Sequence, residues 1–336
     1  MKWILKIAFF FCLFKVQAQD YHFSQFYNNA VDINPANIGL MEDDYRFTSD
    51  YKDQWRTVSN PFVTELGAFD AKILKDSKRN NILNGGIIFI NDKAGTGKMG
   101  YWFVAGGVSS SIKISKKGIL SAGASGGIGR YTMNVGAFTW DSNWDGTQVN
   151  AGGPSEANIY SGGAIRNIKA GMVYNHTVNS RFVYSAGLTL NNILRPNLTH
   201  TGSGDKLRFR YTLAADAKID IVNTNKSILP KLLVMNQGTN LEITPGCVYR
   251  YGLGLQSQHT GINKSSAIYL GLFYRTRDAI IFYTGYDYKH YVTIGLSYDL
   301  NLSPLTVATY SIGGFELTLS HSGLFSKNKK SSASFN

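Results

Sequence analysis

The feature that most constrains the fold is an alternation of apolar and polar residues over long stretches of the chain. Between residues 208 and 221 one face is apolar throughout, whereas the other face carries mostly charged and polar side chains. A period of two residues is typical of a β-strand whose two faces meet different environments. Comparable segments, about fourteen in all, lie near 45–51, 62–74, 82–91, 99–114, 118–132, 162–174, 180–192, 206–221, 227–236, 240–255, 266–276, 279–288, 291–299 and 311–320.

The length of these segments favours strands that cross a bilayer. Most contain roughly nine residues or more, which is long for a soluble sheet but suits a membrane-spanning strand. A sheet can span lipid only when it closes, and bacterial barrels have even strand numbers, short periplasmic turns and long outer loops. With the N-terminus inside, the long connections 133–161 and 300–310 fall outside, although 256–265 is long for an inner turn. We therefore predict an all-β, transmembrane antiparallel β-barrel of about fourteen strands, covering residues 45–321.

Composition agrees with an alternating chain. Charged residues make up 17% of the sequence, against about 25% in typical soluble domains, yet the mean hydropathy is −0.14. Apolar residues are thus interleaved with polar ones, and no run of about 18 apolar residues forms a candidate membrane helix. A secreted β-sandwich or propeller is the alternative. The ladder of charges on one strand face argues against it, because a dry core does not accept unpaired charges.

The two ends of the chain differ from the alternating region. Residues 1–18 are typical of a secretory signal peptide, with Lys2 before an apolar stretch and Val16-Gln17-Ala18 at the cleavage site. We expect residues 19–44 to form an N-terminal periplasmic or plug-like segment. Residues 322–336 are basic and rich in serine, and we expect a flexible tail there.

Charge and cysteine content narrow the function classes. The net charge of +12 falls to +9 when the three lysines of the signal peptide are removed. Because an exported chain rarely meets nucleic acid and the basic residues are scattered, we expect outer-membrane lipid or a protein as partner, and no nucleic acid. Cys247 is the single cysteine after residue 18, and one thiol makes neither an intramolecular disulfide nor a zinc site.

Two short motifs suggest ligands. The glycine-rich stretch 123–129 lacks the dinucleotide spacing and the P-loop lysine, so it favours small side chains in a curved or crowded strand. Asp141, Asn143 and Asp145 match the opening of a calcium loop. The twelfth position of that loop is Gly152 rather than glutamate, so an Asx-rich turn is the alternative to a metal site.

Catalytic signatures are absent from the sequence. It contains neither His-Glu-x-x-His nor Gly-x-Ser-x-Gly. Sequence spacing does not exclude a serine, a histidine and an acid that the barrel wall brings together. We nevertheless predict a protein that is not an enzyme and needs no cofactor.

The residues after the signal peptide carry specific motifs, above all His22-Phe-Ser-Gln-Phe-Tyr27 and Asn34-Pro-Ala36. Together with motifs further along, they resemble the PorP/SprF family of outer-membrane proteins associated with the type IX secretion system. Lys52 stands where arginine is common in that family. The further motifs are Tyr45-Arg46, Tyr51-Lys-Asp-Gln-Trp55, Asp145-Gly146, Pro154-Ser-Glu156, Leu229-Pro230, Gly271-Leu-Phe-Tyr-Arg275, Arg277-Asp-Ala-Ile-Ile281, Gly285-Tyr-Asp-Tyr288, Gly295-Leu-Ser-Tyr-Asp299 and Gly314-Phe-Glu316.

The resemblance implies an outer-membrane barrel that works with the secretion machinery. It implies export or surface retention of a large exported protein, such as a gliding adhesin, through that partner's C-terminal secretion domain. It also implies contact with periplasmic ring or peptidoglycan-associated components. A diffusion porin or hydrophobic-solute channel is the competing function.

Two sets of residues are our candidates for function. Exposed aromatic side chains make good anchors for a partner, so we expect partner contacts at Trp55, Trp140 and Trp144, with packing at the membrane interface as the alternative. A second set of charged residues is expected to face the lumen, where they would pair across the barrel or line a narrow wet interior. These are Arg208, Arg210, Asp216, Lys218 and Asp220.

Overall fold

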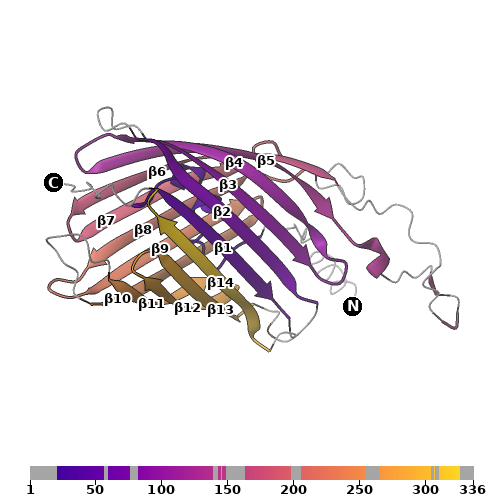
Figure 1. Ribbon diagram of the computed structural model, residues 1–336. Coiled ribbons are helices and arrows are strands. Elements are labelled where there is room, and N and C mark those ends of the chain that lie inside the picture. Colours follow the sequence, from indigo (N-terminus) through magenta and orange to yellow (C-terminus); the bar gives the residue numbers. More distant parts are fainter. Residues whose placement is uncertain are drawn as a thin grey trace, which may run out of the picture.

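The computed structural model describes residues 21–56, 60–75, 82–138, 143–144, 146–148, 163–197, 206–254, 265–303, 306 and 310–325. Within them fourteen antiparallel strands form one closed barrel in sequence order, with β1 paired to β14 (Figure 1). The strands are β1 (Tyr45–Gln54), β2 (Phe62–Lys75), β3 (Ile82–Ala94), β4 (Met99–Lys113), β5 (Gly118–Thr132), β6 (Ala164–Asn179), β7 (Phe182–Asn191), β8 (Arg210–Asp220), β9 (Lys226–Gln237), β10 (Asn240–Leu253), β11 (Ser266–Arg275), β12 (Ala279–Tyr288), β13 (Val292–Asn301) and β14 (Ile312–Gly323).

The predicted barrel is thereby confirmed, with small differences at strand ends. β8 begins at Arg210 rather than at residue 206, and β14 ends at Gly323. Residues 322 and 323, which we expected in the tail, therefore belong to the wall. The predicted signal peptide lies outside the described residues.

The alternation of the sequence places apolar residues on the outside of the barrel, and most of the polar strand residues on the inside. Val108 and Ile128 are 56% and 63% exposed on the outer face, whereas Ser109 and Ser121 are almost fully buried within. This arrangement suits a wall that faces lipid on one side and packed polar groups on the other. In the described part of the chain, no helix is long and apolar enough to cross a membrane.

The two ends of the barrel differ in their connections. We call the end where β1 begins and β14 finishes the inner end, and the opposite end the outer end. The longest connection, residues 133–163, and the connections 192–209 and 302–311 all join strands at the outer end. Long loops on the side opposite the start of the first strand and the finish of the last strand are the pattern of bacterial outer-membrane barrels.

The remaining helices are short. α2 (Ala30–Ile33) and η1 (Pro35–Asn37) precede the first strand, and η2 (Val135–Ala137) follows β5. Two clusters of buried apolar side chains lie on the inward face of the wall, one around Phe23 and the other around Phe26. Both clusters thus include a residue from the chain before β1, which gives the barrel a packed interior.

Candidate functional site: the luminal segment and its polar anchor

Residues 21–44, which we call the luminal segment, lie inside the barrel and contact all fourteen strands. The contacts are hydrogen bonds, ion pairs, ring contacts and close backbone approaches. In strand order from β1 to β14, the pairs are Ser24 with Lys52, Gly39 with Asp70, Gly39 with Asn84, Ile38 with Ser109, Pro35 with Gly123, Asp32 with Lys169, Ile33 with Thr189, Tyr21 with Arg210, Tyr27 with Lys231, His22 with Glu242, Phe26 with Phe273, Tyr27 with Tyr283, Gln25 with Ser297, and Gln25 with Glu316.

The luminal segment runs from the outer end of the barrel to the inner end. At its start, the ring of Tyr21 lies 6.2 Å from that of Tyr101, near the outer end of β4. At its finish, the backbone N–H of Asp44 donates to the carbonyl of Gly323, the last residue of β14, over 2.8 Å. The segment therefore passes along the length of the interior before the chain enters the wall.

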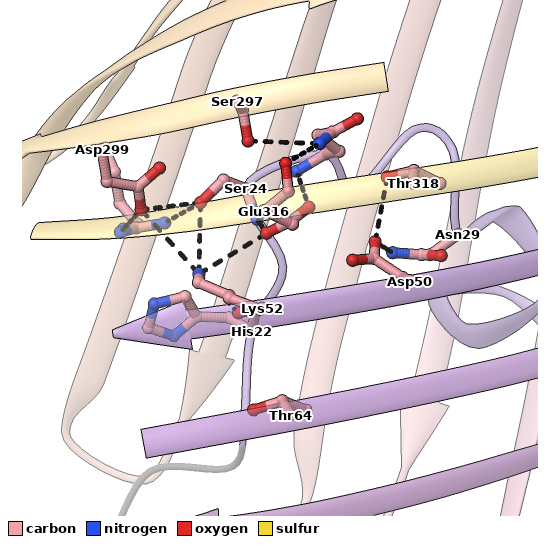
Figure 2. A network of polar contacts seen from close by, with 12 residues as sticks. His22, Ser24, Asn29, Asp50, Lys52, Thr64, Ser297, Asp299, Glu316 and Thr318 are labelled. Carbon is pink, nitrogen blue, oxygen red and sulfur yellow. Dashed lines mark hydrogen bonds and ion pairs between the residues drawn. The ribbon is translucent and has the colours of Figure 1, made fainter. Parts of the chain in front are cut away.

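The tightest attachment is a group of buried polar residues that we call the polar anchor. Lys52 is at its centre, with a side chain that is 1% exposed. Its Nζ donates to the carbonyl of His22 at 2.9 Å and to Oγ of Ser24 at 3.1 Å (Figure 2). The anchor comprises His22, Ser24, Gln25, Lys52, Arg275, Ser297, Asp299 and Glu316.

Glu316 holds the backbone of the luminal segment. Its two carboxylate oxygens accept the backbone N–H groups of Ser24 and Gln25, each over 2.7 Å. The Nε2 of Gln25 in turn donates to the carbonyl of Glu316 at 3.0 Å and to Oγ of Ser297 at 3.3 Å. Hydrogen bonds to an ionised acceptor are about twice as strong as neutral ones, so this contact fixes both the position and the register of the segment.

A second cation completes the charge balance of the anchor. Arg275 Nη2 lies 2.7 Å from Asp299 Oδ2, which also accepts the hydroxyl proton of Ser24 over 2.7 Å. Lys52 Nζ is 3.8 Å from both Asp299 and Glu316. Two buried cations thus face two buried carboxylates. Removing one partner would leave an uncompensated buried charge, which typically costs about 3–5 kcal/mol.

His22 contributes its backbone carbonyl to the anchor, and its imidazole belongs to the luminal segment rather than to a strand. Its Nδ1 is 3.7 Å from Glu242 Oε2. Burial lowers the pKa of His22 well below the usual 6.5, and the positive charges of Arg275, Lys52 and Arg210 lower it further. The docked luminal segment therefore carries a neutral imidazole at neutral pH.

A second polar attachment lies deeper in the interior. Asp50 Oδ2 accepts hydrogen bonds from Asn29 Nδ2 at 2.5 Å and from the hydroxyl of Thr318 at 3.3 Å (Figure 2). Asp50 and Thr318 face each other on β1 and β14. Asn29 therefore attaches the luminal segment to the seam where the first and last strands meet.

Asp32 forms a third attachment, on the opposite side of the segment. Its Oδ1 lies 2.6 Å from Lys169 Nζ and accepts the hydroxyl proton of Tyr21 over 2.7 Å. Burial by itself raises the pKa of the Asp32 carboxyl, but the positive charges of Lys169 and Arg210 outweigh that effect and hold it below its usual range. The carboxylate is therefore ionised at neutral pH.

The motif Asn34-Pro35-Ala36 places a side-chain amide against the wall. Asn34 Oδ1 accepts the N–H of Ala36 at 2.9 Å, and its Nδ2 donates to the carbonyls of Met172 and Leu188 at 3.0 and 3.1 Å. Nearby, a Cβ on Gly123 would lie 2.5 Å from the carbonyl oxygen of Pro35. Glycine at this position of the wall is what lets the segment approach so closely.

The comparison with known protein families decides the identity. A family model described as "Type IX secretion system membrane protein PorP/SprF" matches residues 15–321. The chain belongs to the PorP/SprF family. It is therefore a component of the type IX secretion system in the outer membrane, and the resemblance drawn from the sequence motifs is confirmed.

The chain is similar to several solved structures at low identity. The Ralstonia pickettii toluene transporter TbuX is 12% identical, with a TM-score of 0.48 over 88% of this chain and 94% of that one. The P. putida toluene transporter TodX is 10% identical, with a TM-score of 0.48 over 89% and 95%. KdgM porin is 9% identical, with a TM-score of 0.40 over 82% and 98%. No curated protein matches the chain, and the family assignment rests on the sequence match.

The predicted partner-binding tryptophans do not form one cluster within the described residues. Trp55 follows β1, and its ring packs against Phe62 at 4.8 Å. Trp144 lies in the long outer connection and is 54% exposed. Trp140 lies outside the described residues, as do Asp141 and Asp145 of the candidate calcium loop, whereas Asn143 is buried. In the described part of the chain, no three His, Cys, Asp or Glu residues are grouped to hold a metal.

The five charged residues expected in the lumen have different surroundings. Arg210 is buried at the outer end, with its guanidinium 5.9 Å from the ring centre of Tyr21. Lys218 and Asp220 form an ion pair of 3.4 Å along β8 rather than across the barrel. Arg208 precedes β8 and is exposed, and Asp216 is exposed as well.

Sequence reasoning missed the residues of the polar anchor as a site. Four strands supply the charged residues Lys52, Arg275, Asp299 and Glu316. Their spacing in the sequence does not indicate that they are in contact. A signal was present, since all four lie within the motifs that resemble the PorP/SprF family. The same motifs include the luminal residues that they hold, from His22 to Gln25.

Proposed function

We propose that this PorP/SprF barrel helps to export a partner protein, or retains it at the cell surface, by binding the partner's C-terminal secretion domain at its outer end. A large adhesin, such as a gliding adhesin, is the class of partner. Other secretion-system or peptidoglycan-associated components would bind at the inner end. Residues 1–18 would act as a cleaved signal peptide that delivers the chain for export.

The observation that supports this function is the occupied interior. A luminal segment that contacts every strand does not leave the open lumen that a diffusion porin needs. Hydrogen bonds from buried charged residues of the wall hold it near the outer end, where a solute would enter. The surface left for recognition is the group of outer connections, which includes Trp55 and Trp144.

Co-purification tests the proposal. The full chain is extracted from its own membranes in mild detergent, and the proteins that accompany it are identified by mass spectrometry. We expect one exported surface protein together with secretion components, and a lower yield of that protein from a W55A/W140A/W144A variant. Trp102→Ala is the matched control, because Trp102 is an exposed tryptophan on the outward wall rather than in a loop. Absence of any surface protein or secretion component would contradict the proposal.

Conductance separates this function from the competing one. A porin or solute channel predicts steady current through the purified barrel in a planar bilayer, altered by substitutions of luminal charges. A retention component predicts little current from the intact chain. Loss of one surface protein after deletion of the gene, without a change in uptake of small solutes, is the matching result in cells.

A further inference from the structure

Three cationic side chains and a tryptophan line a recess on the outer wall near the outer end. The recess has a volume of about 560 Å³, and Lys93, Lys98, Trp102 and Arg130 line it together with Thr132 to Asn134. Lys93 is near the end of β3, Trp102 near the start of β4 and Arg130 near the end of β5. All four named side chains are exposed.

The register of the strands places these residues within two adjacent rows of the wall. Trp102 faces Arg130 on β5 and Asn91 on β3, and Lys93 is one row nearer the outer end, opposite Gly100. Lys98 belongs to the turn between β3 and β4, where its N–H donates to the carbonyl of Gly95 over 3.1 Å. β3, the turn after it and β5 thus bring positive charge to the same end of the outward face.

The recess borders directly on the apolar band of the wall. The next outward residues toward the middle of the membrane are apolar. They are Phe89 on β3, two residues from Asn91, together with Val104 on β4 and Ile128 on β5. Tryptophan is typical of the level where hydrocarbon meets headgroups. The height at which lipid phosphates lie therefore coincides with the height of the cations.

The cations of the recess are not paired with acidic side chains in the described part of the chain. Within the described residues, Lys93, Lys98 and Arg130 form no ion pair, and no acidic side chain lines the recess. Glu65 on β2, the strand next to β3, is one row from Lys93, and it accepts a 2.8 Å hydrogen bond from Asn91. On β6, Arg166 is exposed one row below Arg130 and adds a further positive charge.

We infer that this recess binds the phosphate group of an anionic glycolipid of the outer leaflet, with the cations on the phosphate and the acyl chains along the apolar band. Charge complementarity and the shared height of cations and lipid phosphates carry this assignment. The site is separate from the luminal segment, and it holds whether or not the barrel retains a surface protein. Its role is to fix the barrel in the leaflet that carries such lipids.

Lipid titration by native mass spectrometry of the full, folded barrel in detergent tests the inference. The probes are monophosphoryl lipid A, the same lipid after dephosphorylation, and inorganic phosphate. We expect K93Q/K98Q/R130Q to bind monophosphoryl lipid A about tenfold more weakly than the unaltered chain. The control K113Q/K116Q/K117Q removes the same charge at the inner end and should bind as the unaltered chain does.

The remaining outcomes each decide the inference. We expect the dephosphorylated lipid to bind the unaltered chain as weakly as it binds the triple variant. We expect inorganic phosphate to leave the binding of monophosphoryl lipid A unchanged. Equal binding of the two lipids, or equal binding by the triple variant and the unaltered chain, would overturn it. Displacement of lipid by millimolar phosphate would also overturn it, in favour of a site for the free ion. Folding of each variant is checked by the change in its gel migration on heating. If the triple variant does not fold, R130Q alone replaces it, with a smaller loss of lipid affinity expected.

Discussion

Lys52 of β1 and Glu316 of β14 are register partners at the seam where the barrel closes, and both bind Ser24 of the luminal segment. Two residues further along the same seam, Asp50 and Thr318 are partners, and Asp50 accepts a hydrogen bond from Asn29. The segment therefore contacts the first and last strands at two successive levels. Docking of the segment and closure of the wall stabilise each other.

Replacing Lys52 by methionine should destabilise the barrel strongly. Asp299 and Glu316 would then share one buried cation, Arg275, and we expect a loss of about 3–5 kcal/mol in the free energy of unfolding. Urea titration of the barrel in detergent, followed by tryptophan fluorescence, measures the change.

Two control variants make this prediction specific. Lys52→Arg retains the positive charge and should keep most of the stability. Lys218→Met removes an ion pair whose lysine is 49% exposed, and such surface pairs contribute only about 0–1 kcal/mol. Equal effects of the Lys52→Met and Lys218→Met substitutions would show that the anchor does not stabilise the fold.

A single methyl group on the inner wall should loosen the luminal segment. In Gly123→Ala the new Cβ would lie 2.5 Å from the backbone oxygen of Pro35, so the segment must shift, at a cost of about 1–3 kcal/mol. Gly106 has no atom within 4 Å of an added Cβ, and Gly106→Ala is the matched control. Limited proteolysis at residues 21–44 should accelerate in the first variant and stay unchanged in the second.

Removing the luminal segment should open the interior. We expect a variant lacking residues 21–40 to conduct ions in planar bilayers well above the level of the full chain, because the groups that cross the lumen are gone. The variant must first migrate as a folded barrel in an unheated gel. Equal currents from the two proteins would mean that the segment does not obstruct the path.

Acidification should weaken docking of the luminal segment through His22. The pKa of this histidine is lowered in the docked state, whereas an exposed histidine titrates near about 6.5. Below about pH 6.5 the undocked segment binds a proton that the docked segment does not, so docking is fully favourable above that pH and weakens as the pH falls.

Hydrogen exchange of the backbone amides in residues 21–44, compared at about pH 7.5 and 5.5 after correction for intrinsic rates, measures this weakening. Glu242, Lys52, Arg275 and Arg210 are the charged groups that surround the imidazole. The variant His22→Gln should lose the pH dependence. An unchanged dependence in that variant would assign the effect to another group.

The wall of the barrel could be predicted because each strand has its own alternation of apolar and polar residues, with a period of two. The pattern is complete within a fifteen-residue segment such as 118–132. Because the barrel is surrounded by lipid, the edge strands can satisfy their backbone hydrogen bonds only when the sheet closes. The polar anchor could not be predicted in this way, because Ser24 meets Asp299 across 275 residues of chain. Only the resemblance of the separate motifs to the PorP/SprF family indicated these residues, and it did not predict that they are in contact.

The predictions for single side chains depended on where each strand begins. Arg208 was assigned to a strand, but the wall starts at Arg210, so alternation no longer determines the direction of Arg208. The pairing of Lys218 with Asp220 along one strand also follows from their spacing of two residues, which puts both on the same face. Contacts across the interior depend on the luminal segment, whose sequence has no simple period.

The direction of the luminal segment determines the sidedness of the chain. One pass through the interior and fourteen strands make fifteen crossings of the membrane, and an odd number puts the two ends of this path in different compartments. Tyr21 accordingly lies at the outer end, whereas Phe325 lies at the inner end beside Tyr45. A label at residue 21 and one at residue 325 would therefore report on opposite faces of the same membrane.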